Sequence, residues 1–362
     1  MLQTTKKRLL PLFLLFLLAV MPLTAQKAAA DSPDALTKGR ASLDADVRLI
    51  PGGDVFGVRV FMPGVMVASL CDVKSKDGIF RPAEEGGILK KDMITHVNGC
   101  EIHHAKQLTD MVEKSNGDTL ALTVQRKGET LTLSLTPVLA SENGRYRLGL
   151  IVRDRTAGIG TVTFVNPQTG EFGGLGHGIC DPETGEVVPL ARGSVTDVHL
   201  VGISRGASGA PGELRGVLGH SRRGALTVNS ASGVFGVLTD LPQNADKEAL
   251  PIARANQVKV GKAHILCTLS DGEKCRYEIE ITKINEKNKD SKCFSLRVKD
   301  PALIEKTGGI VQGMSGSPII QDGRLVGAVT HVTVNDPTAG YGIFIENMLN
   351  ASNARNELPK AA

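Results

Sequence analysis

The chain has 362 residues, of which 41% are hydrophobic and 22% charged, and it is long enough for two globular domains. Its formal net charge of +4 falls to +1 without Lys6, Lys7 and Arg8, which stand near the N-terminus. This balance excludes the basic surface typical of proteins that bind nucleic acids, so we expect no nucleic-acid partner.

The first 30 residues have the pattern of an export segment. Basic residues precede an apolar run from Leu9 to Val20, broken only by Pro11, and small residues follow. The run is short for a membrane span, which favours a signal peptide over an anchor. We therefore expect residues 1–30 to be a signal peptide or membrane anchor that directs export across the cytoplasmic membrane and brings the N-terminus to the membrane surface. Residues 31–52, rich in Ala, Asp, Ser and Lys, are expected to be a linker.

The cysteines form no C-x-x-C pair and no histidines stand at zinc-finger spacing, so we expect neither a metal site nor a cofactor. Export would permit disulfides, and two of the cysteines are spaced to close a hairpin, Cys267 and Cys275. Buried free thiols would explain the same residues equally well. The six are Cys71, Cys100, Cys180, Cys267, Cys275 and Cys293.

Residues 53–140 predict a compact unit of strands and two helices. Asp54 to Phe61 alternates as a strand, and another strand begins at Gly64. The stretch Arg81–Gly99 predicts a short helix, a glycine stop and a strand that ends in an Asn-Gly turn. A second helix carries apolar residues at three-and-four spacing, and two alternating strands follow it. Its apolar residues are Ala105, Leu108, Met111 and Val112.

This order of elements resembles a PDZ domain over nearly its full length, through the Pro-Ala-x-x-Gly-Gly helix, the Asp-x-Ile strand and the Asn-Gly turn. The resemblance implies a groove where an extended peptide adds as a further strand and backbone N–H groups hold a C-terminal carboxylate. We expect the groove beside the strand Gly64, Val65, Met66 and Val67. Side chains of this strand are also expected in the core, which is compatible because strand addition uses backbone groups.

Residues 145–350 consist of short β-branched segments separated by glycine turns, a pattern that favours a β-barrel or sandwich. Helix is expected only near Ala245 to Val258 and after Ile345. Residues 351–362 are expected to be a polar tail. The whole chain is therefore predicted to be mostly β.

A serine stands on a glycine turn in Gly313-Met314-Ser315-Gly316-Ser317-Pro318, directly before a predicted β-hairpin. Glycine permits positive φ and lets a substrate carbonyl approach main-chain N–H groups, as an oxyanion hole requires. We expect Ser315 to be a nucleophile and the N–H groups of Gly313 and Ser315 to form that hole. The returning strand would present its edge to the substrate through Val329, Thr330 and His331.

A nucleophilic serine needs a base, usually an imidazole oriented by a carboxylate. His177 stands alone among glycines and apolar residues, which makes it the leading candidate base. His220 is an alternative, but Arg222 and Arg223 would disfavour its protonated form. Asp300, fifteen residues before Ser315, is the leading candidate acid, although Asp before Pro is most often a turn former. The alternative acids are Asp181, Asp197 and Asp240.

The nucleophile segment is similar to that of chymotrypsin-like peptidases, which read Gly-Asp-Ser-Gly-Gly-Pro. Met314 and Ser317 replace the Asp and the second Gly, which argues against activation by a new N-terminus. The order His, Asp, Ser is kept, but the interval from Asp300 to Ser315 is short for crossing between two barrels. This implies a divergent fold or an acid from elsewhere. An α/β acyl hydrolase is disfavoured because Gly-x-Ser-x-Gly needs glycine at position 317.

The whole chain resembles the stage IV sporulation protein B family of signalling serine peptidases. The resemblance rests on the segments 174–179, 300–301, 307–318 and 335–342. It implies that Ser315 is nucleophile, His177 general base and Asp300 orienting acid. It also implies secretion into the space between forespore and mother cell, self-cleavage, and cleavage of a membrane-bound regulator of an intramembrane metalloprotease, which would activate a sigma factor. The alternative is an exported, non-catalytic PDZ adaptor with a peptidase-like binding domain.

Overall fold

The structure is a computed structural model that describes residues 47–240, 248–269 and 272–353. The expected signal peptide or anchor, residues 31–46 of the expected linker and residues 354–362 of the expected tail lie outside the described residues. Within them, no helix is both long and apolar enough to cross a membrane. The end of the expected linker is instead strand β1 (Arg48–Pro51), and the start of the expected tail lies in helix α5 (Ile345–Asn353).

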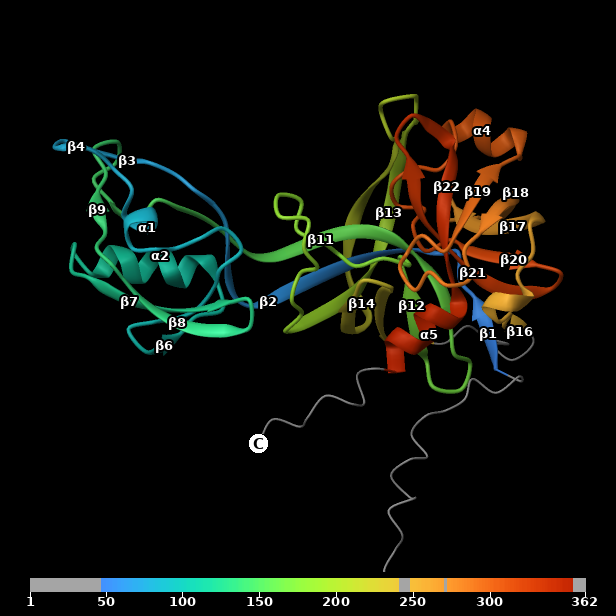
Figure 1. Cartoon of the computed structure of the whole chain (residues 1–362), viewed down its shortest axis with the longest axis horizontal. Helices are drawn as coiled ribbons and strands as arrows, with labels where there is room; N and C mark the ends of the chain where they lie inside the picture. The colour runs from blue at the N-terminus through green and yellow to red at the C-terminus, as the bar shows by residue number, and fades with distance from the viewer. Residues whose placement is uncertain (1–46, 241–247, 270–271, 354–362) are drawn as a thin grey trace, which may run out of the picture. The chain divides into compact units, whose positions relative to one another are not determined.

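The PDZ-like part forms its predicted helices and strands. Helix α2 (Ala105–Lys114) begins where the side chain of Gln107 accepts hydrogen bonds from the N–H groups of His103 and His104, and it buries Leu108 and Val112. The N–H groups at the start of a helix would otherwise have no hydrogen-bond partner within the helix. The other elements are β3 (Val73–Ser75), β4 (Gly78–Phe80), α1 (Pro82–Glu85), β5 (Met93–Val97), β6 (Cys100–Glu101), β7 (Leu120–Arg126), β8 (Glu129–Leu135), β9 (Val138–Leu139) and β10 (Tyr146–Arg147) (Figure 1).

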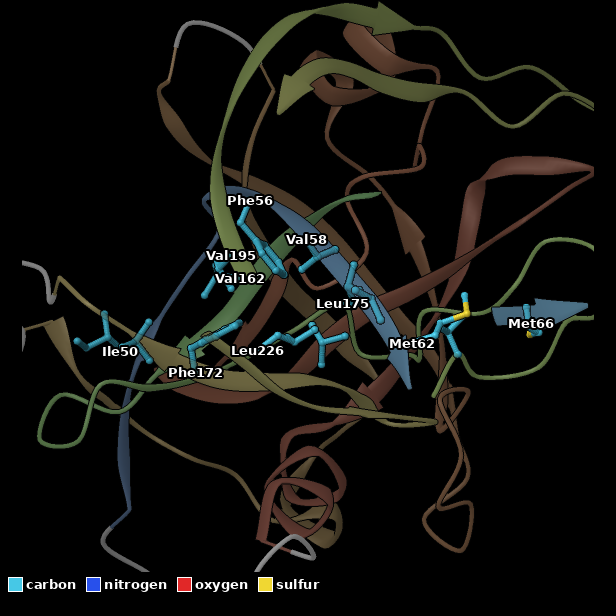
Figure 2. Close-up of a cluster of buried hydrophobic side chains, with 14 of the residues drawn as sticks. Ile50, Phe56, Val58, Met62, Met66, Val162, Phe172, Leu175, Val195 and Leu226 are labelled. Carbon is cyan, nitrogen blue, oxygen red and sulfur yellow. The ribbon is translucent and has the colours of Figure 1, made fainter. Parts of the chain in front are cut away.

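Six strands close into a first barrel because β11 pairs with β12 on one edge and with β2 on the other. Figure 2 shows the apolar side chains of this barrel, among them Phe56, Phe172 and Leu226, which are each no more than 4% exposed. The six strands are β2 (Val55–Leu70), β11 (Leu150–Val165), β12 (Glu171–Gly174), β13 (Arg192–Ser204), β14 (Glu213–Ser230) and β15 (Gly233–Leu238).

Strand β2 is shared between this barrel and the PDZ-like part. Its first half, Val55 to Phe61, pairs with β11, and residues 57–61 also pair with β13. Its later residues Val65 and Met66 pair with β5. The strand that we expected to begin the PDZ domain therefore belongs to the first barrel, because its alternating apolar residues face that barrel's core.

A second barrel is closed by β17 to β22 (Figure 1). Cys267 and Cys275 are register partners in it, and all six cysteines are free thiols. Of the helix expected near Ala245 to Val258, Glu248 is helical among the described residues. The chain then forms β16 (Leu250–Pro251) and a short 3-10 helix, η3 (Ala255–Gln257), because Pro251 lacks the N–H of a helix interior. The barrel strands are β17 (Gly261–Thr268), β18 (Lys274–Ile284), β19 (Phe294–Val298), β20 (Pro318–Gln321), β21 (Arg324–Thr333) and β22 (Asp336–Phe344), with helix α4 (Pro301–Thr307) after β19.

Candidate active site

The Ser315 turn lies between α4 and β20 and depends on two glycines. Gly313 and Gly316 both have φ of +98°, a region that other residues adopt only with strain. Among the described residues, neither the N–H of Gly313 nor that of Ser315 donates a hydrogen bond to a protein acceptor. These two N–H groups, which the sequence predicts to form an oxyanion hole, are therefore free of protein acceptors.

Two buried threonines of β11 hold this turn in place. The hydroxyl of Thr161 donates to the carbonyl of Gly313 at 2.7 Å, and that of Thr163 donates to the carbonyl of Gly316 at 2.8 Å. The N–H of Thr161 also donates to the carbonyl of Ser315 at 2.9 Å. A strand of the first barrel thus fixes the Ser315 turn of the second. The sequence patterns did not single out these two threonines; their only signal is two polar residues at alternate positions of the otherwise apolar segment 157–165.

His177 follows β12 of the first barrel and lies on a loop that packs against the same turn. The loop bends at Leu175 and Gly176, which both have positive φ, +65° and +67°. The N–H of Leu175 donates to the carbonyl of Thr161 at 3.2 Å, so Thr161 contacts both the histidine loop and the serine turn. The structure therefore brings the loop of His177 and the turn of Ser315 together, from separate barrels.

The tautomer of His177 follows from its hydrogen bond. Nδ1 lies 2.9 Å from the carbonyl oxygen of Gly178. A carbonyl only accepts hydrogen bonds, so Nδ1 carries the proton and Nε2 has the free lone pair of a base. Burial lowers the pKa of His177, and the bond to the Gly178 carbonyl offsets part of this effect. The imidazole is thus neutral and able to accept a proton near neutral pH.

The hydroxyl of Ser315 donates a hydrogen bond to the carbonyl of Thr330 at 2.8 Å. It must turn away from that carbonyl to give its proton to an imidazole. His331 follows Thr330 in the chain. The centroid of its ring lies 5.0 Å from the centroid of the His177 ring. Burial, the neighbouring His177 and the charge of Lys292 lower the pKa of His331 to about 4. The site therefore contains a serine and two neutral histidines.

The structure does not join Asp300 to His177. The carboxylate of Asp300 caps α4, where it accepts hydrogen bonds from the N–H groups of Ala302 and Leu303 at 3.0 and 3.2 Å, and from the N–H of Glu278 at 3.2 Å. Pro301 at the first helical position suits this capping role.

The other acids that we considered also have partners elsewhere. Asp181 is 1% exposed and binds Arg153, whereas Asp197 and Asp240 bind Arg223. The alternative base His220 is exposed on β14. In the described chain, the hydrogen bond of the His177 ring goes to a backbone carbonyl instead of a carboxylate. No group of three or more His, Cys, Asp or Glu side chains in the described ranges could hold a metal ion.

The expected cleft residues differ in accessibility. Val329 and Thr330 are no more than 1% exposed, and the backbone of Val329 bonds to that of Gly316 and Ser317. Only His331 of the three is partly exposed. Val329 and Thr330 therefore support the Ser315 turn, and of the expected cleft residues only His331 is accessible from solvent.

The expected peptide groove beside Gly64, Val65, Met66 and Val67 is not open. Val65 and Met66 pair with β5, and Met66 and Val67 pair with β11, so this stretch has no free edge for a further strand. Val65 and Val67 are fully buried. The segment is a central strand because its apolar side chains fill the core of the PDZ-like part.

A cavity of about 340 Å³ lies instead between α2 and the start of β11. Its walls include Leu108 and Val112 of α2 and Leu150 and Val152 of β11. Residues 150–153 pair with β2 on one edge, and their other edge has no strand partner among the described residues. Two basic side chains, Lys74 and Arg147, and two acidic ones, Asp72 and Glu142, also line the cavity. It offers an unpaired strand edge, apolar walls and charged groups of both signs.

Comparisons with known proteins found matches to both parts of the chain. A model of the SpoIVB peptidase S55 family matches residues 144–349, and a PDZ domain model matches residues 51–136. Among solved structures, the chain is similar to the active form of the Rv3671c protease of M. tuberculosis, with 14% identity over 57% of this chain and 77% of that chain and a TM-score of 0.33. It is also similar to the HtrA-type protease AlgW with decapeptide, with 11% identity over 60% of this chain and 56% of that chain and a TM-score of 0.34.

A third solved structure is the PDZ domain of an SdrC-like protein from Listeria monocytogenes, with 20% identity over 26% of this chain and 93% of that chain and a TM-score of 0.22. The predicted mostly β chain, with a PDZ domain before a barrel peptidase domain, is confirmed. The peptidase family model matches more than half of the chain. The chain therefore belongs to the SpoIVB peptidase S55 family of serine peptidases.

Proposed function

We propose that this chain is a serine endopeptidase in which Ser315 and His177 perform the reaction. Nε2 of His177 accepts the proton of Ser315 as Oγ bonds to the substrate carbonyl carbon, and the N–H groups of Gly313 and Ser315 stabilise the oxyanion. The protonated imidazole then gives its proton to the leaving amine, and water hydrolyses the acyl-enzyme by the reverse sequence of transfers. This proposal rests on one observation: the N–H groups of Gly313 and Ser315 have no protein acceptor, and they lie on a turn packed against the His177 loop.

The substrates that we propose are the chain itself and a membrane-bound regulator of an intramembrane metalloprotease. Cleavage of that regulator would release the metalloprotease and activate a sigma factor in sporulation. The chain would act after export, in the space between forespore and mother cell, with its N-terminus at the membrane surface. Membership of the SpoIVB peptidase S55 family supports this context.

The PDZ domain would select the protein that is cut. We propose that an extended peptide pairs with the free edge of residues 150–153 and that Lys74 and Arg147 attract its terminal carboxylate. A peptide with a free C-terminus should therefore bind more tightly than its amidated form, measured by fluorescence anisotropy. Equal affinity of the two peptides, or equal binding by the Lys74→Ala, Arg147→Ala double variant, would contradict this carboxylate role.

Self-cleavage tests the peptidase directly. Purified wild-type protein should produce fragments whose new N-termini can be sequenced, whereas Ser315→Ala should stay intact with an unchanged circular dichroism spectrum. Ser221→Ala, which changes an exposed serine of β14, is the matched control and should be cleaved like wild type. Identical fragments from Ser315→Ala would disprove the assignment, and an intact, unreactive wild type would favour the non-catalytic PDZ adaptor.

A further inference from the structure

Two cysteines of the second barrel face each other across neighbouring strands. Cys267 on β17 and Cys275 on β18 are register partners in an antiparallel ladder. Residues opposite each other in such a ladder place their side chains on the same face of the sheet, with Cα atoms about 4.5–5.5 Å apart. A disulfide needs Cα atoms roughly 4.4–6.8 Å apart. This pair of residues therefore has the backbone separation of a disulfide.

The electrostatics of this end of the barrel also place the two thiols together. Burial raises the pKa of Cys267 to about 12, and the neighbouring Cys275 adds to the effect. Burial also raises the pKa of the Tyr277 phenol, and both thiols contribute to that shift. The two sulfur atoms are thus neighbours of each other and of the same phenol.

The remaining cysteines lack such a partner. In the described ladders, no other cysteine has a cysteine opposite it. Cys293 is buried and donates a hydrogen bond to the carbonyl of Asp290 at 2.9 Å. The other three are exposed, namely Cys71, Cys100 and Cys180.

The two opposed thiols differ in accessibility. Cys267 is 1% exposed, whereas Cys275 is partly exposed near the start of β18. The thiolate is the reactive form of a cysteine, and the raised pKa of Cys267 keeps its side chain a thiol at neutral pH. An external reagent would therefore react with Cys275 first.

We propose that Cys267 and Cys275 form a cross-strand disulfide by exchange with an external low-molecular-weight disulfide. The Cys275 thiolate attacks one sulfur of that disulfide, forms a mixed disulfide and releases one thiolate. Cys267 then loses its proton, and its sulfur attacks Sγ of Cys275, which releases the second thiol. The two protein thiols are oxidised to one disulfide, and the external disulfide is reduced to two thiols.

The disulfide would close the β17–β18 hairpin, which supports helix α4. The N–H of Glu278 on β18 donates to the Asp300 carboxylate that caps this helix, and the Glu278 carbonyl accepts a hydrogen bond from the N–H of Asp300 at 3.1 Å. Helix α4 ends at Thr307, and the chain then enters the Ser315 turn. A cross-link stabilises a fold mainly by restricting the unfolded chain, and it persists only outside a reducing cytoplasm, as after the export proposed above.

The test is a thiol map of the full-length protein after treatment with oxidised glutathione. Trypsin cleaves after Lys274, between the two cysteines, so the disulfide should appear as two peptides that stay joined until dithiothreitol is added. The oxidised protein should also unfold at a temperature about 5 °C higher than the reduced protein.

Cys275→Ser should give no joined peptides and no redox-dependent shift in Tm. Cys100→Ser removes an exposed cysteine of β6 and is the matched control, which should oxidise like wild type. Wild-type protein in which both Cys267 and Cys275 are still alkylated as free thiols, or in which Cys275 carries glutathione without the link, would overturn this inference. Neither result depends on how Ser315 reacts with a serine-directed phosphonate, so the proposed function is tested separately.

Discussion

Gly316 has a backbone conformation that only glycine adopts freely, with φ of +98°. A Cβ at this position would collide with the carbonyl oxygen of Thr161 and the amide nitrogen of Leu175. Thr161 belongs to the strand that holds the Ser315 turn, and Leu175 belongs to the loop that carries His177. This glycine therefore lets the Ser315 turn pack closely against both segments.

Gly316→Ala should destabilise the protein by about 1–3 kcal/mol from backbone strain alone, with more from the collision, and should slow phosphonate labelling. Gly323→Ala is the matched control, because Gly323 also has positive φ, +73°, but a Cβ there meets open space. Gly323→Ala should lower the free energy of unfolding by about 1 kcal/mol and leave phosphonate labelling unchanged. Urea unfolding of the two variants measures the difference, and equal losses of stability and reactivity would contradict this account of Gly316.

The residue types of the site could be predicted from the sequence, but not all of their partners. The glycines flanking Ser315 and the isolated setting of His177 indicated a nucleophile and a base. The orienting group could not be found in this way, because the proton on Nδ1 of His177 goes to the carbonyl of Gly178, and every residue has a carbonyl. A backbone acceptor leaves no signal in side-chain identity.

At the level of elements, helix α4 explains the Asp-Pro pair at positions 300 and 301. A side-chain oxygen at the position before the first helical turn satisfies N–H groups that have no partner inside the helix. Asp300 does this for Ala302 and Leu303, and it also binds the N–H of Glu278 on β18. The position of Asp300 before Ser315 and the family resemblance predicted a catalytic role for the same residue, because neither distinguishes a helix cap from a catalytic acid.

Asp300→Ala should lower the free energy of unfolding by about 1 kcal/mol, the usual loss for a capping residue. Asp300→Ser keeps a capping oxygen without a charge and should retain most of that stability. Under conditions in which both variants are folded, a serine-directed phosphonate should label their Ser315 at close to the wild-type rate. If Asp300→Ser is stable but unreactive, Asp300 is a catalytic acid in the folded enzyme and its capping role is secondary.

Strands were predicted more securely than their pairing. The alternating residues 54–61 and the apolar residues 64–67 were recognised as strand, but they proved to be halves of β2, which pairs in the first barrel and in the PDZ domain in turn. Alternation shows that a strand has a buried face, not which neighbour covers it. The open strand edge that lines the cavity of the PDZ domain lies on β11, at residues 150–153, which we had assigned to the next domain.

At the level of the whole molecule, the site exists only where two barrels meet. His177 comes from the first barrel and Ser315 from the second, with Thr161 of the first barrel bonded to the serine turn. Asp300 lies on the same barrel as Ser315, as the short interval between them in sequence suggested. Barrel closure is a long-range property of pairing, so the sequence patterns indicated many strands in a barrel or sandwich, but not which strands close each barrel or where the two barrels meet.

The central claim is that Ser315 is a nucleophile activated by His177, and a mass-spectrometric map of a serine-directed phosphonate tests it most directly. Intact wild-type protein should gain one adduct, located on the peptide that contains Ser315. His177→Ala, with a wild-type circular dichroism spectrum, should gain little or none in the same time. No adduct on the wild type, an adduct on another serine, or undiminished labelling of Ser315 in His177→Ala would contradict the claim.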